Sequence, residues 1–366
     1  MIARMPRVRC LQLPLVVLAL LGPPAVSAGQ ASRRAAVPVD PVDGILEAFK
    51  THQVVMLPGG HGGKRGYELL SRILRDPRSP GLITDVVVEF GTSRYQDLID
   101  RYMRGEAMPA AAIRRAWQDT ANPGVTHDNP FVEEFYSELR TLNAGFRKEQ
   151  RYRVLGGDPP IDWDNMVSAA DVRRWTVRRD SFAADLIHRE VVERGRRALV
   201  VYGPAHFPRK EVLTNFDMSN WQAQTMTSLL EAAGIKPFVI LSDSGPEAVN
   251  LQADIGSWRV PSLTLVRGTV LGAADFTTFN GENDRFTIRG VDDFVKLPKE
   301  QHKPMPMEEM ADAILWNGVT APPTPILLSK ETCADPGYLS MRLKRIALAG
   351  LPKGEADAAR KACGVQ

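Results

Sequence analysis

Four ionisable side chains each follow a short, mostly apolar run of the kind that forms a buried strand. They are His61, Glu89, Asp158 and His206, and the runs before them cover residues 54–57, 86–88, 153–156 and 198–202. Continuous apolar runs that end in turn residues are typical of strands buried on both faces of a parallel sheet. Such sheets place their chemistry beyond the carboxyl ends of the strands, so we expect these side chains to meet in one pocket. Two imidazoles and a carboxylate could act there as a base, an orienting partner and a transition-state stabiliser.

Each of these residues also has a simpler structural interpretation. His61 and His206 could be ordinary loop histidines, and Asp158, which precedes two prolines, could only shape a turn. Glu89 could cap the following helix or pair with Arg94. We favour the shared pocket because the structural interpretation needs four independent coincidences. Two histidines and a glutamate are also a known zinc-binding combination with a water in the fourth position, so a metal site stays open as an alternative.

Other catalytic signatures are missing from the sequence. It contains no G-x-S-x-G, no P-loop, no H-E-x-x-H and no G-x-G-x-x-G after a strand. Without a nucleophile elbow, water is the expected attacking species. The remaining histidines, which we expect to be solvated or structural, are His52, His127, His188 and His302.

The hydrophobic pattern predicts an α/β fold. Residues 54–103 contain two strand–loop–helix units in a row, which is typical of a parallel sheet. We expect a mostly parallel sheet flanked by helices on both faces, with one long helix over 180–194 and a C-terminal helical hairpin over 336–349 and 355–362. The expected domains are a signal peptide (1–28), a flexible leader (29–41), the α/β domain (42–325) and the C-terminal hairpin packed on it (326–366).

The N-terminus predicts an exported protein with cleavage near Ala28, and an uncleaved anchor is the alternative. Three arginines precede the apolar stretch 11–21, and the small residues 25–28 suit a signal peptidase. Loss of residues 1–28 removes these arginines and no acid, so the formal net charge of +3 falls to zero. A near-neutral protein has no electrostatic reason to bind nucleic acid. No other segment is long and apolar enough to span a bilayer, so we expect no stable membrane span after cleavage.

Two cysteines, Cys333 and Cys363, remain after the signal peptide is removed. An exported chain meets an oxidising compartment, and the two residues flank the expected C-terminal hairpin. We therefore predict a disulfide that holds this hairpin closed, with two unpaired thiols in a cytosol-like setting as the alternative.

Several short motifs resemble those of the erythromycin esterase-like group. The motifs are L-P-G-G-H-G, V-V-V-E-F-G, W-T-V-R-R-D, V-Y-G-P-A-H and D-A-I-L-W-N-G, spread between residues 51 and 318. This group belongs to one superfamily with the ChaN-like haem-uptake proteins and the Tiki proteases. The resemblance places His61, Glu89, His206 and the pair Arg179-Asp180 on family positions. One position differs, because Pro58-Gly59-Gly60 stands where the family has a glutamate before the first histidine.

The resemblance implies hydrolysis without a covalent intermediate, with His61 as the base that activates water. Glu89 would orient or tune a histidine, and His206 would polarise the carbonyl or protonate the leaving group. Arg94 or Arg179 would stabilise the oxyanion, with Asp158 beside the substrate. The other branches leave two alternatives open, namely a hydrolase with zinc or manganese on His61, Glu89 and His206, and a haem-binding protein without turnover. In each case the partner is a small molecule.

Overall fold

A seven-stranded sheet forms the centre of the fold, in the order β3-β2-β4-β1-β5-β9-β6. The strands are β1 (Val54–Pro58), β2 (Asp85–Thr92), β3 (Arg153–Asp158), β4 (Ala198–Tyr202), β5 (Phe238–Asp243), β6 (Ser262–Leu265) and β9 (Ala313–Trp316). All neighbours pair in parallel except β6, which runs antiparallel to β9. The predicted, mostly parallel sheet is confirmed.

This computed structural model describes residues 33–59, 63–210, 224–243, 255–276, 286–290, 293–296, 304–318 and 328–365. Residues 34–366 form one unit. A separate two-stranded sheet pairs β7 (Phe286–Gly290) with β8 (Asp293–Lys296). Within the described ranges, no helix has the length and apolar character needed to cross a bilayer.

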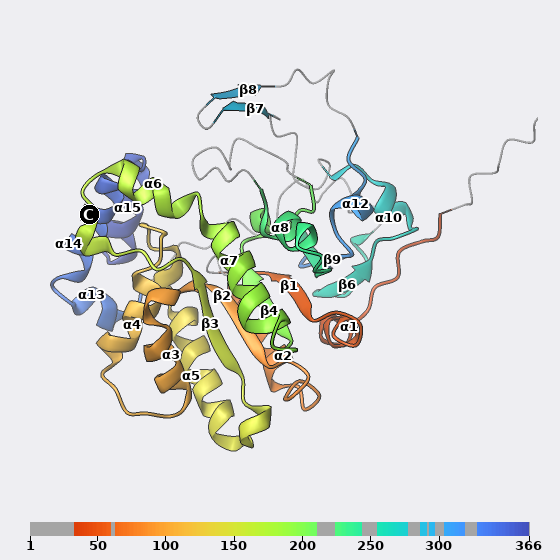
Figure 1. Cartoon of the computed structure of the whole chain (residues 1–366), viewed down its shortest axis with the longest axis horizontal. Coiled ribbons are helices and arrows are strands. Elements are labelled where there is room, and N and C mark those ends of the chain that lie inside the picture. Colours follow the sequence, from red (N-terminus) through yellow and green to blue (C-terminus); the bar gives the residue numbers. More distant parts are fainter. Residues whose placement is uncertain are drawn as a thin grey trace, which may run out of the picture. The chain divides into compact units, whose positions relative to one another are not determined.

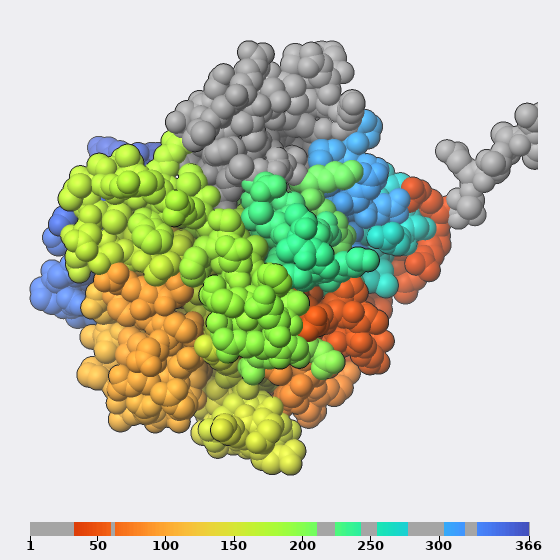
Figure 2. Space-filling model, in the orientation of Figure 1, coloured from red at the N-terminus to blue at the C-terminus, as the bar shows by residue number. Residues whose placement is uncertain are grey.

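Helices cover both faces of the central sheet (Figure 1). On one face lie α1 (Pro41–Ala48), α2 (Lys64–Arg75), α3 (Gln96–Met103), α4 (Ala110–Gln118) and α5 (Pro130–Gly145). On the other lie α7 (Arg179–Ile187), α8 (Met226–Ala232), α10 (Val270–Ala273) and α12 (Met307–Met310). Figure 2 shows α7 and α8 side by side on the near face, in yellow-green and green. The short α6 (Ala169–Thr176) precedes α7.

The strands alternate between two cores, and this alternation orients Glu89. Val86, Val88 and Phe90 pack with α1–α5, whereas Val87 packs with α7 and α8. Successive strand side chains point to opposite faces, so Glu89 projects toward the face that α7 covers. The prediction that the strand ends at Glu89 is wrong, because β2 continues to Thr92 with a register irregularity after Val88.

The predicted long helix over 180–194 is also corrected. Regular α7 ends at Ile187 and is followed by a π-helical turn, His188–Val192. The segment then reverses at Gly195, whose φ of 64° is in the left-handed region that glycine tolerates. The first turn of α7 carries Arg179 and Asp180.

The C-terminus forms the predicted helical hairpin, α14 (Tyr338–Leu348) and α15 (Lys353–Ala362), preceded by the short α13 (Lys330–Ala334). Cys333 and Cys363 form a disulfide, with their Cα atoms 5.4 Å apart. Both the hairpin and the disulfide are confirmed.

The described part of the expected leader lies along the far edge of the sheet. Arg34 bridges Thr269, and Val39 bridges Leu263 of β6. A cavity of about 600 Å³ opens between this segment, α1 and β6. Of the described residues expected in the active site, none lines it, and β6 and β3 are opposite edges of the sheet.

Candidate active site

Glu89 is the centre of a buried cluster of charged side chains. Arg179 Nη2 donates to its Oε1 at 2.7 Å, and the backbone N–H of Gly203 donates to its Oε2 at 2.7 Å. His206 Nε2 and His127 Nε2 lie 3.6 Å and 3.8 Å from Oε1. Only 1% of Glu89 is exposed, so solvent screens these interactions little.

Arg179 joins Glu89 to Asp158. The Arg179 Nε donates to Asp158 Oδ1 at 2.7 Å, and the backbone N–H of Ala121 donates to Asp158 Oδ2. Burial raises the pKa of Asp158 above its usual value, although Arg179 and the Ala121 N–H act in the opposite direction. Burial alone would lower the pKa of Arg179, but Asp158 and Glu89 outweigh it and raise that pKa. Arg179 therefore remains charged at any physiological pH.

His206 lies in the 3₁₀ turn Pro204–His206 directly after β4. Its Nδ1 donates to Asp180 Oδ1, in the first turn of α7. Burial would lower the pKa of His206, yet Asp180 and Glu89 together raise it to about 10. The imidazole is therefore protonated at neutral pH, with Nδ1–H directed at Asp180 and Nε2–H on the side of Glu89. A group in this state can donate a proton or a hydrogen bond but cannot act as a base.

Tyr202 packs against the edge of this cluster. Its ring meets the His206 ring edge-on, with centroids 5.4 Å apart. Gly157 makes this placement possible, because a Cβ there would overlap the Tyr202 hydroxyl. The Tyr202 hydroxyl is buried and has no hydrogen-bond partner among the described residues.

The structure describes three of the four residues that were predicted to share one pocket. Glu89, Asp158 and His206 follow or lie in neighbouring strands β2, β3 and β4 and belong to one cluster. His61 lies outside the described residues, three positions beyond β1. Since β1 pairs with β4, the chain leaves β1 next to the strand that precedes the turn with His206.

The two arginines expected to face an oxyanion are separated by the fold. Arg179 is in the cluster. Arg94 is partly exposed in the turn after β2, and its Nη2 pairs with Asp162 Oδ2 at 2.8 Å. Arg94 thus neutralises a carboxylate of the β3–α6 connection, and the structure records no contact between Arg94 and Glu89, Asp158 or His206 in the described parts.

His127 was expected to be solvated or structural, and the structure buries it beside Glu89, with 1% of the residue exposed. Its Nδ1 lies 3.1 Å from Thr120 Oγ1. Sequence reasoning missed it because a polar stretch between two helices gives no local signal of burial. Asp180, by contrast, was marked by the R-D pair that opens α7.

The described residues of the cluster do not suit a divalent metal ion. No group of three or more His, Cys, Asp or Glu side chains among them is arranged to hold a metal ion. Both oxygens of Glu89 already accept hydrogen bonds, and a metal-binding imidazole must be neutral, whereas His206 is protonated. The charge of Arg179 at the same carboxylate would also repel a cation.

Comparison with known proteins finds similarity in fold only. No protein-family profile matches the chain, and no curated protein matches it. A solved structure named succinoglycan biosynthesis protein is similar in fold, with a TM-score of 0.50 and 10% identity over 78% of this chain and 94% of that one. A Bacillus cereus protein gives a TM-score of 0.46 and 12% identity, covering 78% and 95%. The type III effector HopBA1 gives 0.37 and 15%, covering 58% and 88%. These likenesses concern the fold alone.

Proposed function

We propose that this chain is an exported hydrolase that uses water to cleave an ester, lactone or amide bond of a small molecule. The proposal is carried by the buried position of Glu89 between Arg179, His206 and the Gly203 N–H, at the carboxyl ends of neighbouring parallel strands. Taking ions out of water costs several kcal/mol each, on the order of what a whole domain gains from folding. Strongly shifted pKa values of this kind gather at functional sites.

In the proposed reaction, His61 takes a proton from water and the water oxygen attacks the carbonyl carbon. The protonated His206 donates a hydrogen bond to the developing oxyanion and then its Nε2 proton to the leaving oxygen or nitrogen. Asp180 holds the His206 ring through Nδ1, and Glu89 stabilises its positive charge. Arg179 fixes Glu89 in place. The bond between the carbonyl carbon and the leaving oxygen or nitrogen breaks, and the products are an acid and an alcohol or amine. His61 then releases its extra proton to solvent and His206 takes one back, so both histidines return to their starting states.

Export is part of the same proposal. The disulfide between Cys333 and Cys363 suits an oxidising compartment, and the first 28 residues have the pattern of a signal peptide. Expression with the natural N-terminus, followed by fractionation and mass determination of the exported form, tests it. Retention of the whole chain in the cytosol would contradict export.

A screen of esters, lactones and amides tests the hydrolase. We expect turnover by the unaltered protein and a fall in kcat of about 10²–10⁴-fold in His61→Asn and in His206→Gln. The control is His188→Gln, since His188 is half-exposed and faces Glu193 at 3.8 Å. Absence of turnover across the screen, or full activity of both site variants, would overturn the proposal.

Metal removal separates this mechanism from the metal-dependent alternative. We expect activity to survive dialysis against a chelator, because His206 and Glu89 are engaged with Asp180, Arg179 and Gly203. Loss of activity that zinc or manganese restores would instead assign His61, Glu89 and His206 to a metal site.

A further inference from the structure

The loop between α4 and α5, residues 119–129, touches the candidate active site on one side. The Ala121 N–H donates to Asp158 Oδ2, and His127 Nε2 lies 3.8 Å from Glu89 Oε1. The loop thus supplies one of the hydrogen bonds that hold Asp158, which in turn binds Arg179. Any displacement of this backbone would remove a partner from a buried carboxylate.

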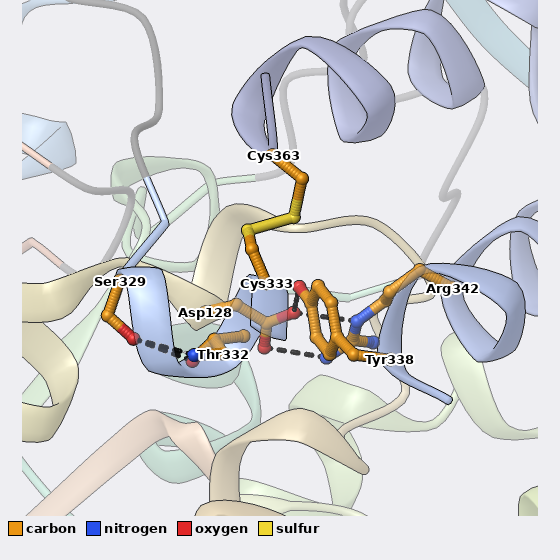
Figure 3. Close-up of a disulfide and its surroundings, with 7 residues drawn as sticks. All are labelled: Asp128, Ser329, Thr332, Cys333, Tyr338, Arg342 and Cys363. Carbon is orange, nitrogen blue, oxygen red and sulfur yellow. Dashed lines mark hydrogen bonds and ion pairs between the residues drawn. A yellow bond between two sulfur atoms is a disulfide. The ribbon is translucent and has the colours of Figure 1, made fainter. Parts of the chain in front are cut away.

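The other side of the same loop is held by the C-terminal hairpin. Arg342 donates to Asp128 from Nε and Nη2, each at 2.6 Å, and the Tyr338 hydroxyl donates to the same carboxylate (Figure 3). One turn further along α14, Arg345 Nη2 donates to Asp119 Oδ1 at 2.7 Å. These contacts hold both ends of the loop, because Asp119 is its first residue and Asp128 is its second-last.

Apolar contacts also hold the loop against the C-terminal hairpin. Val125 of the loop packs with Ile346 of α14 and Ala359 of α15 in one small core. Arg345 also lies over the Trp163 ring, 4.9 Å from its centroid, and Trp163 Nε1 donates to Thr120 O at 2.9 Å. The loop is therefore packed into the hairpin as well as paired with it.

The disulfide closes this arrangement. Cys333 is in α13, before the hairpin, and Cys363 caps the end of α15. In Figure 3 the disulfide lies beside the Asp128–Arg342 pair. The two hairpin helices, of 11 and 10 residues, are too short to be stable in isolation, so their position depends on this cross-link and on the loop.

We propose that the C-terminal hairpin positions the active site, with Arg342 and Arg345 as positioning residues that act through loop 119–129 on Asp158 and Glu89. The inference rests on the proposed function for its kinetic consequence only. Bidentate arginine–carboxylate pairs define geometry as well as energy, and small displacements far from the reacting atoms can reduce rates strongly. The hairpin is thus a remote part of the site, and its contact with the loop joins distant parts of the sequence, since Arg342 and Asp128 are 214 residues apart.

Hydrogen exchange and kinetics on three variants test this. Arg342→Gln leaves the buried Asp128 without its cation, whereas Arg345→Gln leaves Asp119 with Arg115 and Tyr95 as partners and is the milder change. Arg360→Gln is the matched control, because Arg360 pairs only with Asp357 of the same helix in the described structure, at 3.1 Å.

We expect amides of residues 119–129 to exchange severalfold faster in Arg342→Gln and Arg345→Gln, while β1, β2 and β4 keep their protection. We expect kcat to fall about tenfold or more with KM little changed, and Arg345→Lys, which keeps the charge opposite Asp119, to recover most of it. The Arg360→Gln control should match the unaltered protein in both measurements.

Unchanged loop exchange in Arg345→Gln overturns the inference, and so does faster exchange with unchanged kcat. If Arg342→Gln does not fold, Arg345→Gln decides alone. If the unaltered protein turns over no substrate, the proposed hydrolase fails, and the exchange measurement still decides whether the hairpin holds the loop against Asp158.

Discussion

Arg179 Nη2 and Glu89 Oε1 are 2.7 Å apart, although 90 residues separate them in sequence. The contact joins the first turn of α7 to β2, the neighbour of edge strand β3, and the same guanidinium binds Asp158 of β3. Because α7 also carries Asp180, which holds His206, a single helical turn orders every described charge of the candidate site. The site is therefore built on regular secondary structure, and its geometry depends on how α7 packs against β2, β3 and β4.

Substitution of Glu89 by glutamine should lower stability as well as activity. The change removes the negative charge that faces Arg179 and His206, while Asp158 still pairs with Arg179 and Asp180 with His206. Removal of one partner from a buried ion pair costs about 3–5 kcal/mol, which denaturant unfolding would measure. The control Glu106→Gln, at an exposed glutamate that pairs with Arg101 and Arg104, should leave the midpoint unchanged. Equal midpoints for Glu89→Gln and the control would contradict the energetic role of Glu89.

Stability should fall as the pH rises from neutral toward 10. The folded pKa of His206 is about 10, against 6.5 for an ordinary histidine, so the protonated form is favoured by folding. This contribution is complete below pH 6.5 and is lost as the pH passes through 10. Melting temperatures between pH 6 and 10 would show the fall, and the fall should be much smaller in His206→Gln. If the melting temperatures of the two proteins fell in parallel with pH, the raised pKa of His206 would be contradicted.

Reduction of the disulfide should loosen the C-terminal hairpin. Cys333 and Cys363 close a loop with a sequence separation of 30 residues, and such a cross-link stabilises by roughly 3–4 kcal/mol on the chain-entropy account. We expect a phosphine reductant to lower the melting temperature of the unaltered protein and to leave that of the Cys333→Ser/Cys363→Ser double variant unchanged. A melting temperature insensitive to reductant in both proteins would show that the cross-link contributes little.

A methyl group at Gly157 should disturb the site through Tyr202. The Cβ of Gly157→Ala would overlap the Tyr202 hydroxyl and lie 2.9 Å from its Cζ. We expect a loss of about 1–3 kcal/mol, as for other overpacked cores, together with reduced activity because Tyr202 packs on the His206 ring. The control Gly354→Ala has no neighbour within 4 Å of the new Cβ and should be neutral or slightly stabilising. An unperturbed Gly157→Ala would mean that Tyr202 moves away freely.

Two of the strands next to the site, β1 and β4, were predictable to within a residue. Residues 54–57 and 198–202 were expected as strands, and β1 and β4 cover Val54–Pro58 and Ala198–Tyr202. A strand buried on both faces needs an unbroken apolar run, and that run is visible in the sequence. The end of β2 was misplaced because Glu89 interrupts the run, although Phe90 and Thr92 continue the strand with full burial.

The histidines show where local reasoning failed. His127 sits in a polar stretch of the kind that is normally solvated, but Arg342, Arg345 and Val125 draw that stretch into the hairpin and bury it. No pattern near His127 contains this information. The protonation of His206 could not be predicted from the sequence either, because it depends on the fold placing Asp180 and Glu89 on the two sides of its ring.

The sequence by itself determined the α/β class, the strands and the polar groups at their carboxyl ends, because hydrophobic periodicity is a local property of the chain. It also indicated the disulfide, since only two cysteines follow the expected signal peptide. Only the tertiary structure decided which charges pair, that Arg179 and not Arg94 belongs to the cluster, and that the C-terminal hairpin contacts the loop beside it. Those outcomes depend on contacts between segments far apart in sequence, and burial there sets both the strength of each ion pair and the protonation of His206.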